Sequence, residues 1–130
     1  MSFLDNIGDL ETVEELRTVQ VGEYELKITS AELRSGDNGE YLVVRFDVTS
    51  DPLAKGITHT VFPPRESDDA KQRHLRKLEM KHFCQAFDLS TSGGLSCTEM
   101  VGKRGWAILA EKDDPEYGMQ NRVRRFIVPK

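Results

Sequence analysis

The sequence of 130 residues has little cysteine and no long apolar stretch. Its two cysteines, Cys84 and Cys97, do not form a close metal-type pair, and two thiols in a chain without export signals indicate a reducing cytoplasm. No apolar run approaches membrane-spanning length, and residues 1–20 lack the basic start and apolar middle of a signal peptide. We therefore expect a soluble cytoplasmic protein without a membrane partner.

Motifs of the common enzyme classes are also missing. No glycine-rich phosphate loop precedes a helix, and neither a serine nucleophile elbow nor a His-Glu helix motif occurs. His74 and His82 are eight residues apart and are not read as ligands, and His59 lies in an expected strand, where histidine is more often packed or solvated. Glu79 and Lys81 resemble part of a nuclease signature, but they lie on an expected helix. We expect no enzymatic activity, no metal and no cofactor.

Acidic residues are concentrated at the start of the chain, whose net charge is −4. Residues 1–16 hold five of the 22 acidic residues and no basic one, so the remainder carries 18 basic residues against 17 acidic ones. Basic residues gather at 70–82 and 121–130. We divide the chain into an acidic leader, residues 1–20, and one folded domain, residues 21–130.

The leader has apolar residues spaced loosely as in an amphipathic helix, although Gly8 weakens that helix. Two interpretations remain open for it, a short docked helix or a flexible acidic arm. Such an arm is either simply solvated or covers a basic groove or recruits a partner. The residues of this pattern are Phe3, Leu4, Asp5, Ile7, Asp9, Leu10, Glu11, Val13, Glu14, Glu15 and Leu16.

The clearest local signal is the period-two alternation of residues 39–48, which predicts a half-buried strand. Its purely apolar face, from Leu42 to Val48, should point into the core. Tyr41, Val43 and Arg45 should lie on the exposed face. A flat sheet face that bears a ring and a cation can stack a base and bind a phosphate, or it can be an ordinary solvated surface.

Similar patterns place the other elements. Strands are expected at 22–33, 56–62, 106–110 and 120–128, with a bend near Ser30 where the alternation changes parity. A turn at 35–39 should join the first two strands in a hairpin. A helix should begin at the cap Ser67-Asp68-Asp69, end near Phe87 and carry a broad apolar arc. A kink is expected near Arg124-Arg125.

This order of elements predicts the fold. Three strands, one helix and two further strands fit a mainly β, five-stranded Greek-key barrel of the oligonucleotide/oligosaccharide-binding (OB) kind, with the helix between strands three and four. Closure of the barrel would remove exposed strand edges. The rival architecture is an open sheet with one helix packed on it.

The chain resembles a group of small phage-encoded proteins that are similar to phage single-stranded DNA-binding proteins. The match covers nearly the whole chain beyond residue 20 and rests on the order and spacing of its motifs. These are Gly22 to Ile28 with Ala31-Glu32; Gly39, Tyr41, Leu42, Val44, Phe46 and Val48; Gly56; Phe83 to Phe87; Gly102-Lys103; and Asn121 to Phe126.

The resemblance implies an OB-like fold in 21–130 and a role in phage DNA replication, recombination or repair in the host cytoplasm. Implied partners are single-stranded DNA and phage replication or recombination proteins, and an oligomer is compatible with the sequence. Phage proteins of the replisome type often recruit partners through an acidic C-terminal tail. This chain ends instead in Val128-Pro129-Lys130, and its acidic stretch is N-terminal, which departs from that pattern.

Basic and aromatic side chains are the candidates for sequence-independent binding of single strands. Phe62 and Trp106 either stack bases or fill the core, and the core is the favoured interpretation for both. A protein-interaction module without nucleic-acid binding is the alternative function, since fold does not fix function. A continuous positive groove would favour the first function and an apolar patch the second. The candidate residues are Lys27, Arg34, Tyr41, Arg45, Phe62, Trp106, Lys112, Tyr117, Arg122, Arg124 and Arg125.

Overall fold

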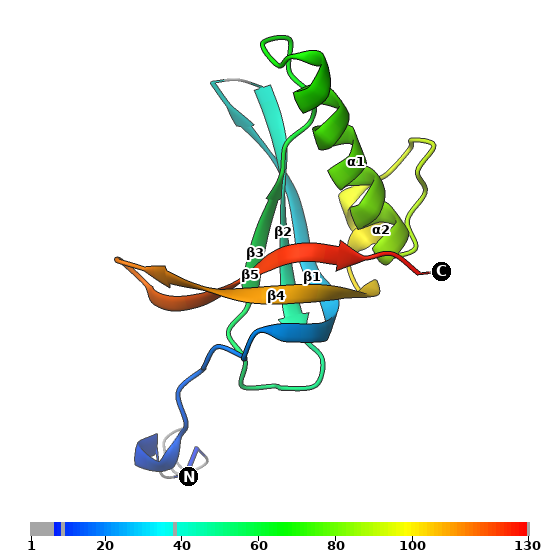
Figure 1. Ribbon diagram of the computed structural model, residues 1–130. Coiled ribbons are helices and arrows are strands. Elements are labelled where there is room, and N and C mark those ends of the chain that lie inside the picture. Colours follow the sequence, from blue (N-terminus) through cyan, green and yellow to red (C-terminus); the bar gives the residue numbers. More distant parts are fainter. Residues whose placement is uncertain (1–6, 9, 38, 130) are drawn as a thin grey trace.

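The computed structural model describes residues 7–8, 10–37 and 39–129. One antiparallel sheet of five strands, in the order β3-β2-β1-β4-β5, dominates these residues, and one long helix joins β3 to β4 (Figure 1). A short helix, α2, lies between α1 and β4. The elements are β1 Gly22–Gly36, β2 Gly39–Val48, β3 Ile57–Val61, α1 Ala70–Ala86, α2 Cys97–Met100, β4 Arg104–Asp114 and β5 Gly118–Ile127.

The bend predicted in the first strand is confirmed. The pairing of β1 with β2 shifts register between Ile28 and Ser30, which marks a bulge. On one side of the bulge β1 pairs with β4, and on the other its pairing with β2 continues into a long hairpin. Because β1 belongs to both parts of the sheet, the β1–β2 and β4–β5 hairpins project in different directions (Figure 1).

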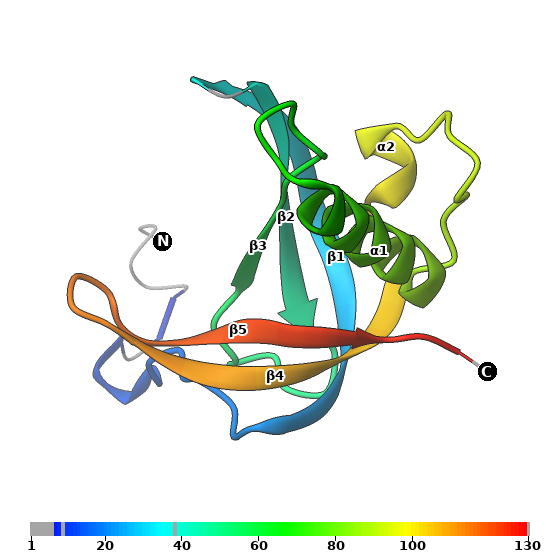
Figure 2. The same ribbon diagram turned by 45° about the horizontal axis from the view of Figure 1, so that its top comes forward.

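The predicted barrel is not closed. β3 and β5 are the edge strands, and no ladder joins them within the described residues. Side chains rather than backbone hydrogen bonds connect the two edges, because the Phe126 ring of β5 lies 5.2 Å from the His59 ring of β3 and 5.4 Å from the Phe83 ring of α1. The protein is therefore mainly β, with an open, strongly curved sheet and α1 beside the opening (Figure 2).

Helix α1 begins at its predicted cap and ends near Phe87, as expected. The Asp69 side chain accepts a hydrogen bond of 2.7 Å from the Gln72 main-chain N–H, and Asp88, just past the end, adopts a φ of 54°. Only the last turns are buried, however. Leu75 is exposed, so the broad apolar arc expected along the whole helix is confined to the C-terminal half.

Phenylalanine rings fill the space between the sheet and α1. Phe46 of β2 stacks on Phe87 at 5.3 Å and meets Phe126 edge-on at 6.2 Å. The burial of β2 from Leu42 to Val48 on this face confirms the alternation. Gly105 of β4 makes the close approach of α1 possible, since a side chain there would collide with the Ala86 carbonyl.

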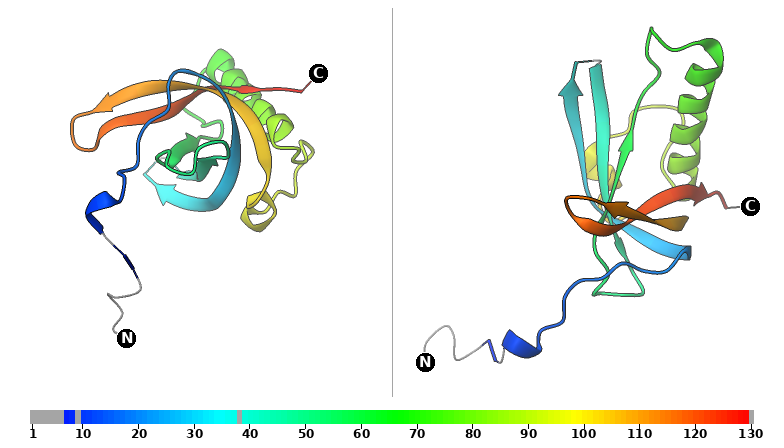
Figure 3. Two further views of the ribbon diagram at one scale, coloured as in Figure 1. Left: turned by 90° about the horizontal axis from the view of Figure 1, so that it is seen from below. Right: turned by 60° about the vertical axis from the view of Figure 1, so that its left-hand side comes forward.

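Parts of the leader and the first turn, Phe3, Leu4, Asp5, Asp9 and Asn38, lie outside the described residues. Among the leader residues that the structure describes, helical structure is limited to a 3-10 turn, η2 Leu10–Thr12. Leu10, Val13 and Leu16 are exposed, and residues 10–16 extend away from the sheet (Figure 3), so these residues form no docked amphipathic helix.

The last residues of the leader are already attached to the folded domain. The Arg17 N–H donates to the Leu53 carbonyl at 2.9 Å, and the Val19 N–H donates to the buried Asn121 side chain at 2.8 Å. In the described part of the chain, no helix is both long and apolar enough to cross a membrane.

Candidate nucleic-acid interface

The outward face of β2 ends in a pair of rings. Arg34 of β1 lies opposite Tyr41 of β2, and Phe62 directly follows β3 on the other side. The ring centroids of Tyr41 and Phe62 are 5.8 Å apart and tilted by 39°. Phe62 is 37% exposed, so the expectation that it belongs to the core is wrong. We call Tyr41 and Phe62 the outer ring pair.

Two guanidinium groups contact Phe62. The Cζ atoms of Arg65 and Arg76 lie 5.0 Å and 5.7 Å from the ring centroid, within the range of cation–π contacts. Arg76 also pairs with the nearly buried Asp68 carboxylate at 2.8 Å. Hydrogen bonds from the Arg65 main-chain N–H and the Arg76 guanidinium hold the pKa of Asp68 below its usual value. Asp68 therefore fixes this loop against α1.

The centre of the same face is less exposed than predicted. Val43 lies between Glu32 of β1 and Thr60 of β3, and it is only 6% exposed because it sits on the central strand of three. Arg45, two residues further along β2, is exposed and forms no ion pair with a described carboxylate. The outward face of β2 thus carries the outer ring pair at one end and the unpaired guanidinium of Arg45 further along the strand.

The β4–β5 hairpin carries the next group of candidates. Lys112, Tyr117 and Arg122 are all exposed on it, with Tyr117 at the tip. The Asp114 carboxylate accepts the main-chain N–H groups of Glu116 and Tyr117, and these bonds lower the pKa of Asp114. The turn therefore presents Tyr117 to solvent on a locally ordered loop.

The kink predicted in the last strand is confirmed. Ile108 of β4 pairs with Arg125, but Leu109 pairs with Val123, which leaves Arg124 as the extra residue of a bulge. Arg124 and Arg125 are exposed without an ion pair among the described residues. Both line a hollow of about 350 Å³ between β5 and α1.

One acidic residue, Glu79, lines that hollow, and its carboxylate already has a hydrogen-bond partner. The Glu79 carboxylate of α1 lies 3.1 Å from the His59 ring of β3. This hydrogen bond holds the pKa of Glu79 below its usual value. Arg124 and Arg125, which we call the edge arginines because β5 is an edge strand, therefore share this hollow with a carboxylate that already has a partner.

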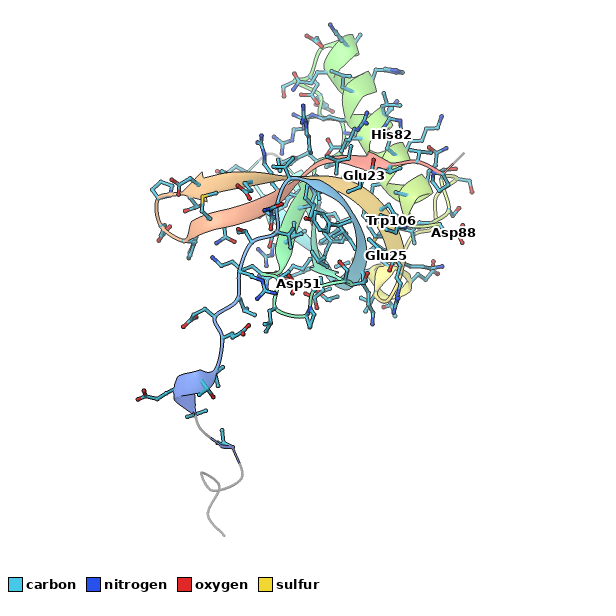
Figure 4. All side chains as sticks on the ribbon, turned by 60° about the horizontal axis from the view of Figure 1, so that its bottom comes forward. Glu23, Glu25, Asp51, His82, Asp88 and Trp106 are labelled. Atoms are coloured by element: carbon cyan, nitrogen blue, oxygen red, sulfur yellow. The ribbon has the colours of Figure 1, made fainter. Side chains whose placement is uncertain are left out.

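Trp106 is on a different surface. It is 50% exposed on β4, opposite Glu25 of β1, so the expectation that it fills the core is wrong (Figure 4). Gly105 and Ala107, its neighbours, take the inward positions. Because Trp106 pairs with the start of β1 and Tyr41 with the end of it, the structure does not bring these two rings together.

Lys27 is also away from the outer ring pair. It is exposed on β1 between Asp47 of β2 and Arg104 of β4. An acid and a base flank it, so it does not extend a purely positive surface.

The remaining candidates flank β3 from two sides. The β1–β2 hairpin carries Arg34 and Tyr41, and the β4–β5 hairpin carries the arginines of the last strand (Figure 3, right). A hydrogen bond of 3.0 Å from the Lys55 side chain to the Met119 carbonyl joins the segment just before β3 to the start of β5. Rings at one end and unpaired cations at the other can bind an extended anionic strand.

Sequence reasoning missed Arg65 and Arg76. They follow Phe62 by three and fourteen residues, and no spacing in the sequence indicates that both return to one ring. It also missed an apolar hollow of about 520 Å³ between the β1–β2 hairpin, α1 and α2. The described residues contain no cluster of three or more side chains suited to a metal ion.

No known protein family matches the chain, and no curated protein sequence is similar to it. The resemblance to phage single-stranded DNA-binding proteins therefore stays a prediction.

Proposed function

We propose that the protein is a non-enzymatic, sequence-independent single-stranded DNA-binding protein that acts in phage DNA replication, recombination or repair. The observation that carries the proposal is the coexistence of the outer ring pair with unpaired guanidinium groups around β3. Arg45 on one side and Arg124 and Arg125 on the other have no carboxylate partner among the described residues. Cations that the fold leaves unpaired are available to phosphates.

The strand order supports the OB assignment that belongs to this proposal. An OB-fold is a partly open five-stranded barrel whose ligand face comprises strands two and three with the loops joining strands one to two and four to five. Here β1 separates β2 from β4, and β3 and β5 approach each other at His59 and Phe126. In this assignment, the turns of the β1–β2 and β4–β5 hairpins would be the flanking loops.

The mechanism needs no chemistry beyond stacking and charge neutralisation. Arginines that contact phosphates release condensed counterions, which makes the affinity depend on salt. Rings stack bases of any identity because every base has a π face. Both terms are indifferent to sequence, as the proposal requires.

A gel-shift assay with a labelled oligothymidylate and its duplex form, at about 50 mM and about 200 mM salt, tests the proposal. We expect preferential binding of the single strand and weaker binding at the higher salt. Equal affinity for duplex and single strand would contradict the stacking argument, and an affinity that does not change with salt would contradict the electrostatic one.

The apolar hollow favours a second candidate, a protein-interaction module. Leu33, Leu42 and Met80 line it, and Leu33 is exposed there. Absence of single-strand binding at both salt concentrations would favour this alternative. A Leu33→Ser variant that keeps full affinity for oligothymidylate would separate the hollow from the nucleic-acid face.

A further inference from the structure

The leader presents apolar side chains to solvent. Leu10 and Val13 are 59% and 66% exposed. The Val13 N–H donates to the Leu10 carbonyl at 3.2 Å, and side chains three residues apart in a 3-10 turn lie on the same side. We call residues 10–13 the leader turn. Its two apolar side chains gain free energy when a second apolar surface removes them from water.

A groove with apolar walls runs beside α1. The apolar hollow of about 520 Å³ between the β1–β2 hairpin, α1 and α2 shares Met80 and Leu95 with a second hollow of about 470 Å³. We call the two hollows together the helix groove. Leu33, which pairs with Leu42 across the hairpin, lines the first hollow and is 60% exposed. Methionine side chains adapt to what they contact, so Met80 and Met100 suit this groove to a peptide segment.

The helix groove and the leader carry opposite charges. Lys77 and Lys81 line the second hollow on the same face of α1 as Met80, and neither forms an ion pair with a described carboxylate. Among the described residues, no acid lines the second hollow and only Glu40 lines the first. The leader has three glutamates between residues 11 and 15. An acidic segment with apolar side chains is therefore complementary to this groove.

The leader points away from the helix groove of its own copy. It is anchored at Arg17, whose N–H donates to the Leu53 carbonyl at 2.9 Å and whose carbonyl accepts the Lys55 N–H at 2.7 Å. That anchor lies beyond the end of β2 at Val48, whereas Leu42, which lines the groove, is near the start of the strand. Figure 1 shows the leader and the tip of the β1–β2 hairpin at opposite ends of the molecule. The leader is therefore better placed to meet the groove of a second copy.

We propose that the leader turn of one copy docks in the helix groove of a second copy. Leu10 and Val13 enter the apolar part of the groove, and the leader glutamates face Lys77 and Lys81. The contact joins two different surfaces of the chain, so it can repeat from copy to copy as an open, head-to-tail series. This assembly goes beyond the proposed function and needs no nucleic acid. That it would make the coating of a single strand cooperative is a consequence that rests on the proposed function.

The test combines two full-length variants. The leader variant, Leu10→Ser with Val13→Ser, keeps an intact groove, and the groove variant, Leu33→Ser, keeps an intact leader. Sedimentation velocity at rising protein concentration, without DNA, should show self-association of the wild type and about tenfold or more weaker self-association of either variant. An equimolar mixture of the two variants should form a dimer and nothing larger, because it offers one intact leader and one intact groove.

Methionine methyl groups locate the contact. The leader variant, labelled with ¹³C in its methionine methyl groups, is titrated with the unlabelled groove variant. The signals of Met80 and Met100, which line the groove, should shift. The signal of Met119 on β5 is the internal control and should stay in place.

The two lysines test the charge complementarity. Lys77→Gln with Lys81→Gln in the labelled protein should weaken the association about tenfold, and added salt should weaken it in the unsubstituted groove. Lys71→Gln, exposed in the first turn of α1 and outside the groove lining, is the matched control and should associate as before. Thermal unfolding of every variant checks that the fold is kept.

Each contrary result overturns the docking and leaves the proposed function standing, because no measurement includes DNA. A wild type that stays monomeric overturns it, and if its Met80 signal then differs from that of the leader variant, the leader docks in its own groove instead. Self-association that both variants keep at full strength assigns the contact to another surface. A mixture of variants that fails to form the dimer contradicts the head-to-tail arrangement.

Discussion

The protein has two aromatic clusters that are built from similar residues and meet different partners. Inside, Phe46 is fully buried and contacts the rings of Phe87 and Phe126. Outside, Phe62 contacts Tyr41 on one side and the guanidinium groups of two arginines on the other. Rings that pack on one another away from water stabilise the fold. Rings that lie beside cations at the surface keep exposed area that a ligand can contact.

This difference teaches that, if the proposed function holds, opposite faces of the same strand carry stability and binding. Phe46 and Tyr41 are five residues apart on β2, and the odd separation sends them to opposite faces. Substitutions in the two clusters should therefore affect different measurements.

The largest effect is expected inside. Phe46→Ala should lower the free energy of unfolding by about 3–5 kcal/mol, because it leaves a cavity among the phenylalanine rings. Denaturant unfolding followed by circular dichroism measures it. Arg45→Ala, the exposed neighbour, is the control and should change stability little; a comparable loss in both variants would show that the two faces are not energetically distinct.

The next effect is expected outside. Tyr41→Ala should weaken oligothymidylate binding by about 1–3 kcal/mol, the contribution of one stacked base, in a titration followed by fluorescence anisotropy. It should also cost a smaller amount of stability, since the ring packs on Phe62. Tyr41→Phe keeps the ring and should bind like the wild type, so a full loss in that variant would assign the effect to the hydroxyl instead.

A smaller change is expected for the cation of that face. Arg45→Ala should weaken binding less than Tyr41→Ala and should reduce the slope of log affinity against log salt by about one, since one phosphate contact is removed. Arg104→Ala, near Glu25, is the control. If Tyr41→Ala and Arg45→Ala combined leave affinity unchanged, the face of β2 is not the site, and Trp106 and the last-strand arginines become the alternatives.

The smallest effect concerns the His59–Glu79 pair beside the edge arginines. Because the folded protein holds the pKa of Glu79 below its unfolded value, the pair contributes stability above that unfolded value and loses it as the pH falls. The difference in unfolding free energy between wild type and Glu79→Gln should therefore shrink between about pH 5 and pH 3. A difference that grows as the pH falls would contradict this assignment.

Much of the local structure was predictable, because its causes are local. Alternation placed β2 from Gly39 to Val48, and the parity changes located the bulges near Ser30 and Arg124. The cap at Asp69 placed the start of α1. Strand ends were less accurate, since β4 continues to Asp114 through polar residues that only pairing with β5 keeps extended.

The rings were harder to place than the strands. Trp106 and Phe62 were expected inside on hydrophobicity, yet parity and pairing put both outside. Hydrophobic residues are buried on average, but side chains alternate along a strand. A residue whose two neighbours in the strand face inward therefore faces outward, whatever its hydrophobicity. On either side of Trp106 the inward positions belong to Gly105 and Ala107, and at Gly105 the end of α1 packs too closely for a side chain.

The sequence by itself determined the order of strands and helix, the first hairpin, the bends and the N-terminal cap of the helix, since these follow from alternation, turn residues and capping within a few positions. The tertiary structure alone decided that the sheet stays open between β3 and β5, and that Arg65 and Arg76 meet over Phe62. The first outcome depends on contacts between residues far apart in the chain, such as His59 and Phe126, and the second on how the segment after β3 folds back along α1. No local pattern encodes such contacts, because they arise only when α1 packs against the curved sheet.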